Sequence, residues 1–209
     1  MLLSFLISVA VSVFVNADKD QFVLEPISTG GNLSSKLVSS IAQDKYGIIW
    51  IGTDEGLDRF DGSKNEVYTH DSAKPIGLNV SWVNCVYPAN DGRLWIGTEK
   101  GVTIFNPEDG RFASCFSEQD AKDRLSTQRI RCLHEDEDGI MWIGTTSGLI
   151  KYNDQSGAVT FFKMPLGEEI PMANEVIDIV EDVNQETGLE TDAHVGALIL
   201  ACQALLGGC

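Results

Sequence analysis

A tetrapeptide that occurs three times limits what this chain can fold into more than any other feature of its sequence. Trp-Ile-Gly-Thr begins at Trp50, Trp95 and Trp142, at spacings of 45 and 47 residues. Each tryptophan has a glycine three residues before it, a second glycine six residues after it and an aromatic residue ten residues after it. A period of this length indicates a repeat architecture in which each unit packs against its neighbours.

Within each unit, short β-branched and apolar runs alternate with turns that contain Gly, Asp or Asn, a pattern that predicts strands joined by hairpins. In the first unit the expected strands are residues 37–43, 48–51, 57–60 and 67–69. Four strands in a unit of about 45 residues are typical of a β-propeller blade, which buries its two faces against neighbouring blades. We therefore expect an all-β propeller with three clear blades of four antiparallel strands, centred on Trp50, Trp95 and Trp142.

The tetrapeptide itself has a predicted structural role. The tryptophans are expected in the core between blades, and a sugar-stacking platform is the functional alternative for them. The glycine lies in a strand interior, where its missing side chain would allow a neighbouring sheet to approach closely.

The repeat stops partway through a fourth unit. Residues 176–182 align with the earlier first strands, but Gly188 stands where the register requires tryptophan. From about residue 185 the sequence changes character, and residues 195–206 form an Ala- and Leu-rich stretch typical of a helix. We expect an incomplete propeller over residues 18–184 and an aberrant or truncated, helix-like tail over residues 185–209. A truncated or frame-shifted gene is the favoured origin of the tail, and an expression scar or a native capping helix are the alternatives.

The N-terminus has the pattern of a signal peptide. Residues 2–15 are apolar, a run shorter than the roughly 20 residues that a spanning helix needs. Val15-Asn16-Ala17 and a charged segment follow, which predicts cleavage after Ala17 and a periplasmic or secreted location. No basic residue precedes the apolar run, and a buried N-terminal strand is the alternative.

Charge and cysteine content exclude several classes of partner. The 31 acidic residues outnumber the 15 basic ones, and a net charge of −16 argues against binding to nucleic acid or anionic membranes. The five cysteines show no spacing of a metal site, and neither metal nor cofactor is predicted. Cys85 and Cys132 stand ten residues before their tryptophans, where the first unit has Ser40. They are expected to be small, buried residues of the inner strands, and a disulfide between them stays open.

Few other residues suggest chemistry, and no catalytic residue is predicted. His70 is expected on an outer strand, His134 in an acidic hairpin and His194 in the tail. The cluster Glu135-Asp136-Glu137-Asp138 lacks the alternating ligands of a calcium loop, which favours a solvated turn. Trp82 lies outside the repeat register and is expected to fill a gap between blades, with sugar stacking as the alternative. The ligand-binding residues stay unassigned.

The run from Leu33 to Gly62 closely resembles the two-component regulator propeller repeat, and the resemblance continues through Asp91–Thr98 and Asp138–Thr145 to cover about residues 22–183. In that family such repeats form the periplasmic sensor of hybrid two-component systems, often with an oligosaccharide ligand. The resemblance implies a non-enzymatic sensor segment that recognises a carbohydrate-derived ligand.

The same resemblance implies a longer parent protein, with further propeller blades, a membrane segment and a kinase. Uncovered blade faces predict self-association of the isolated chain. A propeller enzyme of the lyase or glycosidase type and a protein-interaction scaffold are the alternative functions.

Overall fold

The computed structural model describes residues 33–72, 77–115, 128–162, 175–181 and 195–198, and every element in them is a β-strand. The first sheet contains β1 (Val38–Gln43), β2 (Ile49–Thr53), β3 (Leu57–Phe60) and β4 (Asn65–Tyr68). The second contains β5 (Val83–Pro88), β6 (Leu94–Thr98), β7 (Gly101–Asn106) and β8 (Arg111–Ser114). The third contains β9 (Ile130–Glu135), β10 (Met141–Thr145), β11 (Gly148–Asn153) and β12 (Ala158–Phe162).

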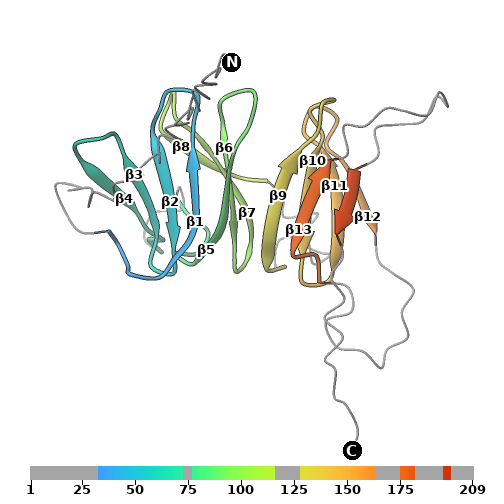
Figure 1. Ribbon diagram of the computed structural model, residues 1–209, viewed down its shortest axis with the longest axis horizontal. Coiled ribbons are helices and arrows are strands. Elements are labelled where there is room, and N and C mark those ends of the chain that lie inside the picture. Colours follow the sequence, from blue (N-terminus) through green and yellow to red (C-terminus); the bar gives the residue numbers. More distant parts are fainter. Residues whose placement is uncertain (1–32, 73–76, 116–127, 163–174, 182–194, 199–209) are drawn as a thin grey trace, which may run out of the picture.

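In all three sheets the strands are antiparallel and lie in chain order, which confirms the predicted four-stranded blades. The blades follow one another side by side (Figure 1). Contacts between them run mainly through the first strands, because β5 packs on β1 and β2, and β9 packs on β5 and β6. The first strands therefore form the inner edge of an arc of blades, the arrangement of an incomplete β-propeller.

The tryptophan of the tetrapeptide is anchored by the hairpin that precedes it. In the first blade, Asp44 accepts a hydrogen bond from Trp50 Nε1 at 2.8 Å, and its other oxygen accepts the amides of Tyr46 and Ile48 at 2.9 and 3.0 Å. In the third blade, Asp136 makes the equivalent three bonds, including one from Trp142 Nε1 at 2.7 Å. One aspartate thus shapes the turn and orients the indole.

The glycine of the tetrapeptide receives a side chain of the next blade. A Cβ on Gly52 would lie 2.7 Å from Val83 Cγ1, and a Cβ on Gly97 would lie 2.6 Å from Ile130 Cγ2. Both β-branched residues stand twelve positions before the tryptophan of their own blade and are fully buried. The expectation that the missing side chain permits close sheet packing is confirmed.

The threonine closes the hairpin that follows. Thr53, Thr98 and Thr145 are fully buried, and each hydroxyl donates to a glycine carbonyl three residues later, at 3.0, 2.9 and 2.8 Å. A buried hydroxyl needs such a partner, since leaving it unpaired would be costly. The isoleucine between tryptophan and glycine faces the preceding blade, and Ile96 and Ile143 are completely buried there.

The first blade has an uncovered face. Val38 is 43% and Ile41 69% exposed, whereas their counterparts in the second blade, Val83 and Val86, are 0% and 8% exposed. Repeat positions that are core in the second and third blades thus lie on the surface of the first. This difference is what an incomplete propeller produces, because no blade precedes the first one within the described residues.

A fourth unit begins as the register predicts, with β13 (Asp178–Glu181). Val176 just before it is fully buried against Gly144, and its amide donates to Thr145 O at 2.9 Å. The expected helix-like tail is wrong for residues 195–198, which form β14 (Val195–Leu198) and pair with β13 in an antiparallel arrangement. The other residues of the tail, and the predicted signal peptide, lie outside the described residues.

Cys85 and Cys132 are free thiols, so the disulfide between them that the sequence leaves open does not form. Both lie on first strands, as predicted, but are partly and not fully buried, with their sulfurs packed against Gly97 and Gly144. Burial raises the pKa of the Cys85 thiol far above its ordinary value and that of Cys132 to about 12.

These two thiols are therefore expected to resist alkylation. In the native protein at pH 8, iodoacetamide should leave Cys85 and Cys132 unmodified, because only the thiolate reacts and burial disfavours it. In urea both should react fully, and peptide mass spectrometry distinguishes the two states. Fast native alkylation of either thiol would contradict this packing.

Candidate functional site

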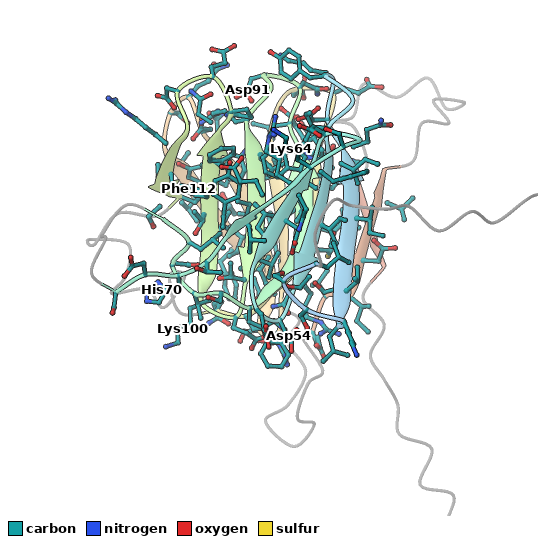
Figure 2. All side chains as sticks on the ribbon, turned by 90° about the vertical axis from the view of Figure 1, so that its left-hand side faces the viewer. Asp54, Lys64, His70, Asp91, Lys100 and Phe112 are labelled. Atoms are coloured by element: carbon teal, nitrogen blue, oxygen red, sulfur yellow. The ribbon has the colours of Figure 1, made fainter. Side chains whose placement is uncertain are left out.

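A cavity of about 510 Å³ opens between the first and second blades, at the end where the first hairpin of each blade turns. Figure 2 marks this end by Lys64 and Asp91, and the opposite end by Asp54 and Lys100. The first blade lines the cavity with Asp44, Tyr46, Ile48, Trp50, Arg59, Glu66 and Tyr68. The second blade contributes Phe105 and the following turn, with Pro107, Glu108 and Gly110.

Aromatic rings form the apolar part of the cavity. Trp50 is completely buried, and the edge of its ring meets Phe105 at a centroid distance of 5.5 Å. The Tyr68 ring centroid lies 5.4 Å from that of Phe105, and the two rings are tilted by 48°. Tyr46 is 59% exposed in the first hairpin. The cavity therefore combines a rigid floor with a solvent-accessible ring.

Its polar part contains both donors and acceptors. The Arg59 guanidinium lies 6.0 Å over the Trp50 ring and 4.0 Å from a carboxylate oxygen of Glu66. Burial and a hydrogen bond to Glu66 raise the pKa of Tyr68 to about 12, so its hydroxyl keeps its proton at neutral pH. Asp44 belongs to the wall, because its two oxygens already accept three N–H groups.

The cavity exists because two repeat positions differ between blade interfaces. Between the second and third blades, the Arg93 guanidinium crosses the same corner and lies 2.5 Å from Asp154, in the turn after β11. The residues in register with Arg93 and Asp154 at the first interface are Ile48 and Pro107. These two side chains cannot form an ion pair, and the corner stays open.

A second cavity, of about 180 Å³, lies near His70, at the end marked by Asp54 and Lys100 in Figure 2. It is smaller than the roughly 300–1,000 Å³ of typical small-molecule sites. His70 stands two residues beyond β4, and its Nδ1 lies 2.8 Å from the Leu78 carbonyl. The His70 amide also donates to Ser81 Oγ at 2.9 Å. His70 therefore holds the connection between two blades, next to the outer strand where it was expected.

The other histidines do not form a site in the described residues. His134 lies in β9, not in the acidic hairpin where it was expected, and its ring centroid is 6.2 Å from that of Tyr87. His194 lies outside the described residues.

The acidic cluster is only partly a solvated turn. Glu137 and Asp138 are exposed, as expected, but Asp136 is 5% exposed because it anchors Trp142. The described residues contain no group of three or more His, Cys, Asp or Glu placed to hold a metal ion.

Trp82 lies on the connection before β5 and is 44% exposed. An indole with this exposure does not fill a gap between blades, so that expectation was wrong. It also lies apart from the 510 Å³ cavity, whose described lining does not include it.

The chain is similar to a protein family, to a larger protein and to solved structures. The family described as "Two component regulator propeller" matches residues 32–55, 77–100 and 124–147. A histidine kinase of Formosa agariphila is 35% identical over 57 residues, which are 27% of this chain and 4% of that protein. Thus the chain spans a small part of the length of this relative.

Among solved structures, the extracellular domain of a protein described as a hybrid two component system from B. thetaiotaomicron matches with a TM-score of 0.54 and 22% identity, over 70% of this chain and 19% of that chain. This likeness supports the propeller fold. A virginiamycin B lyase from Staphylococcus aureus reaches a TM-score of 0.48 at 17% identity, over 66% of this chain and 43% of the lyase, which indicates nothing about activity.

Each of the three matched segments ends just after a Trp-Ile-Gly-Thr strand and begins before the first strand of the same blade. Each segment therefore covers the first two strands of a blade, including the glycine that receives a side chain of the next blade. The described part of the chain contains no helix long and apolar enough to cross a membrane. One segment in each of the three blades thus matches the family described as "Two component regulator propeller".

Proposed function

We propose that this chain is a periplasmic sensor-type propeller segment of a two-component signalling protein, and that it recognises a carbohydrate-derived ligand. The three repeats in register carry the proposal. Two similar proteins support it, because one is the extracellular domain of a protein described as a hybrid two component system and the other is a histidine kinase.

The location and the longer parent belong to the same proposal. Residues 1–17 are proposed to be a signal peptide that is removed after Ala17. Further blades, a membrane segment and a kinase are proposed to follow in a longer protein, since the relatives extend far beyond the matched region. The uncovered face of the first blade, with Val38 and Ile41 exposed, favours contact with another blade of the same type, and self-association when the chain is isolated.

A non-catalytic role fits the contacts of the described histidines. His70 bonds a loop carbonyl and His134 packs on Tyr87, so each has a structural function. Neither lines the 510 Å³ cavity. We therefore prefer ligand binding to turnover.

The purified chain is expected to bind a neutral or acidic oligosaccharide saturably, without converting it. Titration calorimetry over a panel of trisaccharides measures binding, and chromatography of the same samples detects any products. Sedimentation of these samples reports self-association. New sugar products would favour an enzyme, and failure to bind any member of the panel would count against the carbohydrate ligand.

A further inference from the structure

We propose that the cavity between the first and second blades is a binding site for an uncharged sugar ring, an inference that rests on the proposed sensor function. Its volume of about 510 Å³ lies within the roughly 300–1,000 Å³ of small-molecule sites. Such sites combine aromatic walls with a few polar groups that orient the ligand, and this cavity has both.

The aromatic residues suit the apolar faces of a ring. Trp50, Phe105 and Tyr68 contact one another, but Trp50 and Phe105 are 0% and 3% exposed, so the half-buried Tyr68 and the exposed Tyr46 supply the aromatic surface that a ligand can reach. Tyr46 is exposed at the first hairpin, and the Lys45 ammonium lies 5.3 Å from its ring centroid. A planar or chair-shaped ligand can therefore pack on aromatic surface without a large rearrangement.

The charges around the cavity favour a neutral ligand. Asp44 is fully engaged in the wall, and the other charged residues that line the cavity are Arg59, Glu66 and Glu108. An anionic ligand would approach two carboxylates on a chain of net charge −16, and a cation would meet the Arg59 guanidinium. Hydroxyl groups both donate and accept, so a sugar can bond the carboxylates and the guanidinium together.

An acidic residue departs from the repeat at the same place where the corner is open. In the strand pairing, Arg59 lies opposite Glu66, and their counterparts are Ile104 and Ala113 in the second blade and Lys151 and Thr160 in the third. A cation over the repeat tryptophan recurs in the third blade, where Lys151 Nζ lies 5.1 Å from the Trp142 ring centroid, but neither other blade has a carboxylate opposite it. The occurrence of Glu66 beside Ile48 and Pro107, which leave the space unfilled, points to a ligand.

The second interface supplies the design of the test. Replacing Ile48 by arginine and Pro107 by aspartate should recreate the ion pair that Arg93 and Asp154 form, and so close the cavity. Ile140→Arg is the matched control, because Ile140 holds the same repeat position in the third blade, outside the cavity. Arg59→Ile is a second test variant that introduces the residue found at the equivalent position of the second blade.

The probes are cellotriose, maltotriose and xylotriose as neutral trisaccharides and trigalacturonate as an acidic one, each titrated into the full chain by calorimetry. We expect a neutral probe to bind, and its Kd to rise roughly tenfold or more in the closed variant and in Arg59→Ile. Ile140→Arg should bind like the unmodified chain. Urea denaturation of each variant shows that it is folded.

The outcomes separate this inference from the function on which it rests. If both the closed variant and Arg59→Ile bind neutral sugars as the unmodified chain does, the cavity is not the binding site, although the chain can still be a carbohydrate sensor. Binding of trigalacturonate alone would overturn the neutral ligand class. If no probe binds, the carbohydrate ligand itself is contradicted.

Discussion

Replacing Gly97 by alanine is expected to destabilise the chain by about 3 kcal/mol, at the upper end of the usual cost of overpacking. The Cys85 sulfur would be the nearest atom to the new Cβ, and Ile130 Cγ2 and Cβ would lie 2.6 and 3.0 Å from it. Ile130 is fully buried in the next blade. Its Cβ and Cγ2 atoms are attached close to the backbone, so they can move away from the new methyl group only if the strand itself shifts. Urea denaturation followed by tryptophan fluorescence measures the change.

Gly77→Ala is the matched control, since the nearest atom to its added Cβ is a carbonyl oxygen at 3.9 Å. This control should change the free energy of unfolding by less than about 0.5 kcal/mol, as surface substitutions usually do. Equal effects of the two substitutions would show that close packing between blades does not depend on the glycine of the tetrapeptide.

Removing the Asp136 carboxylate is expected to cost about 3 kcal/mol, because two turn amides and a partly buried indole lose their acceptor together. The second blade offers the reverse experiment. Ala89 stands where the other blades have Asp44 and Asp136, and Trp95 Nε1 is buried there without a hydrogen-bond partner.

Ala89→Asp should therefore stabilise the chain by about 1 kcal/mol, the net value of a typical hydrogen bond. The backbone is already suitable: Gly92 N donates to Ala89 O at 2.9 Å, as Gly139 N does to Asp136 O at 3.0 Å. Urea midpoints of Asp136→Ala and Ala89→Asp should move in opposite directions. A loss of stability in both variants would refute the anchoring role of the aspartate.

Most of the blade architecture is predictable from the sequence, because the repeat reports the same local environment three times. The expected strand at residues 57–60 coincides with β3, and the expected strand at 37–43 is one residue longer than β1. The fourth strand of the first blade begins at Asn65 and not at residue 67. The polar residues Asn65 and Glu66, which precede the apolar run, also pair with β3.

The tail shows where local preference fails. An Ala- and Leu-rich stretch predicts a helix, but residues 195–198 pair with β13 instead. Strand pairing satisfies the open edge of β13, and such tertiary context overrides a weak helical preference.

The cavity could not be predicted, although its residues are visible in the sequence. Ile48 and Pro107 are 59 positions apart, and only the packing of the two blades brings their turns to one corner. A comparison of repeat positions singles out Arg93 and Asp154 as differences, but does not show that their side chains meet. Asp136 illustrates the same limit, because its acidic neighbours suggest a solvated turn while its bond to Trp142 requires burial.

The sequence by itself determined the repeating unit, since periodic tryptophan, glycine and threonine reflect contacts that every blade makes with itself and its neighbour. Only the tertiary structure decided which interface is closed and which is open. That outcome depends on pairs of side chains from different blades, the ion pair of Arg93 with Asp154 at one interface and the mismatch of Ile48 with Pro107 at the other. Pairwise contacts across a packed interface leave no period in the sequence, because each is made once.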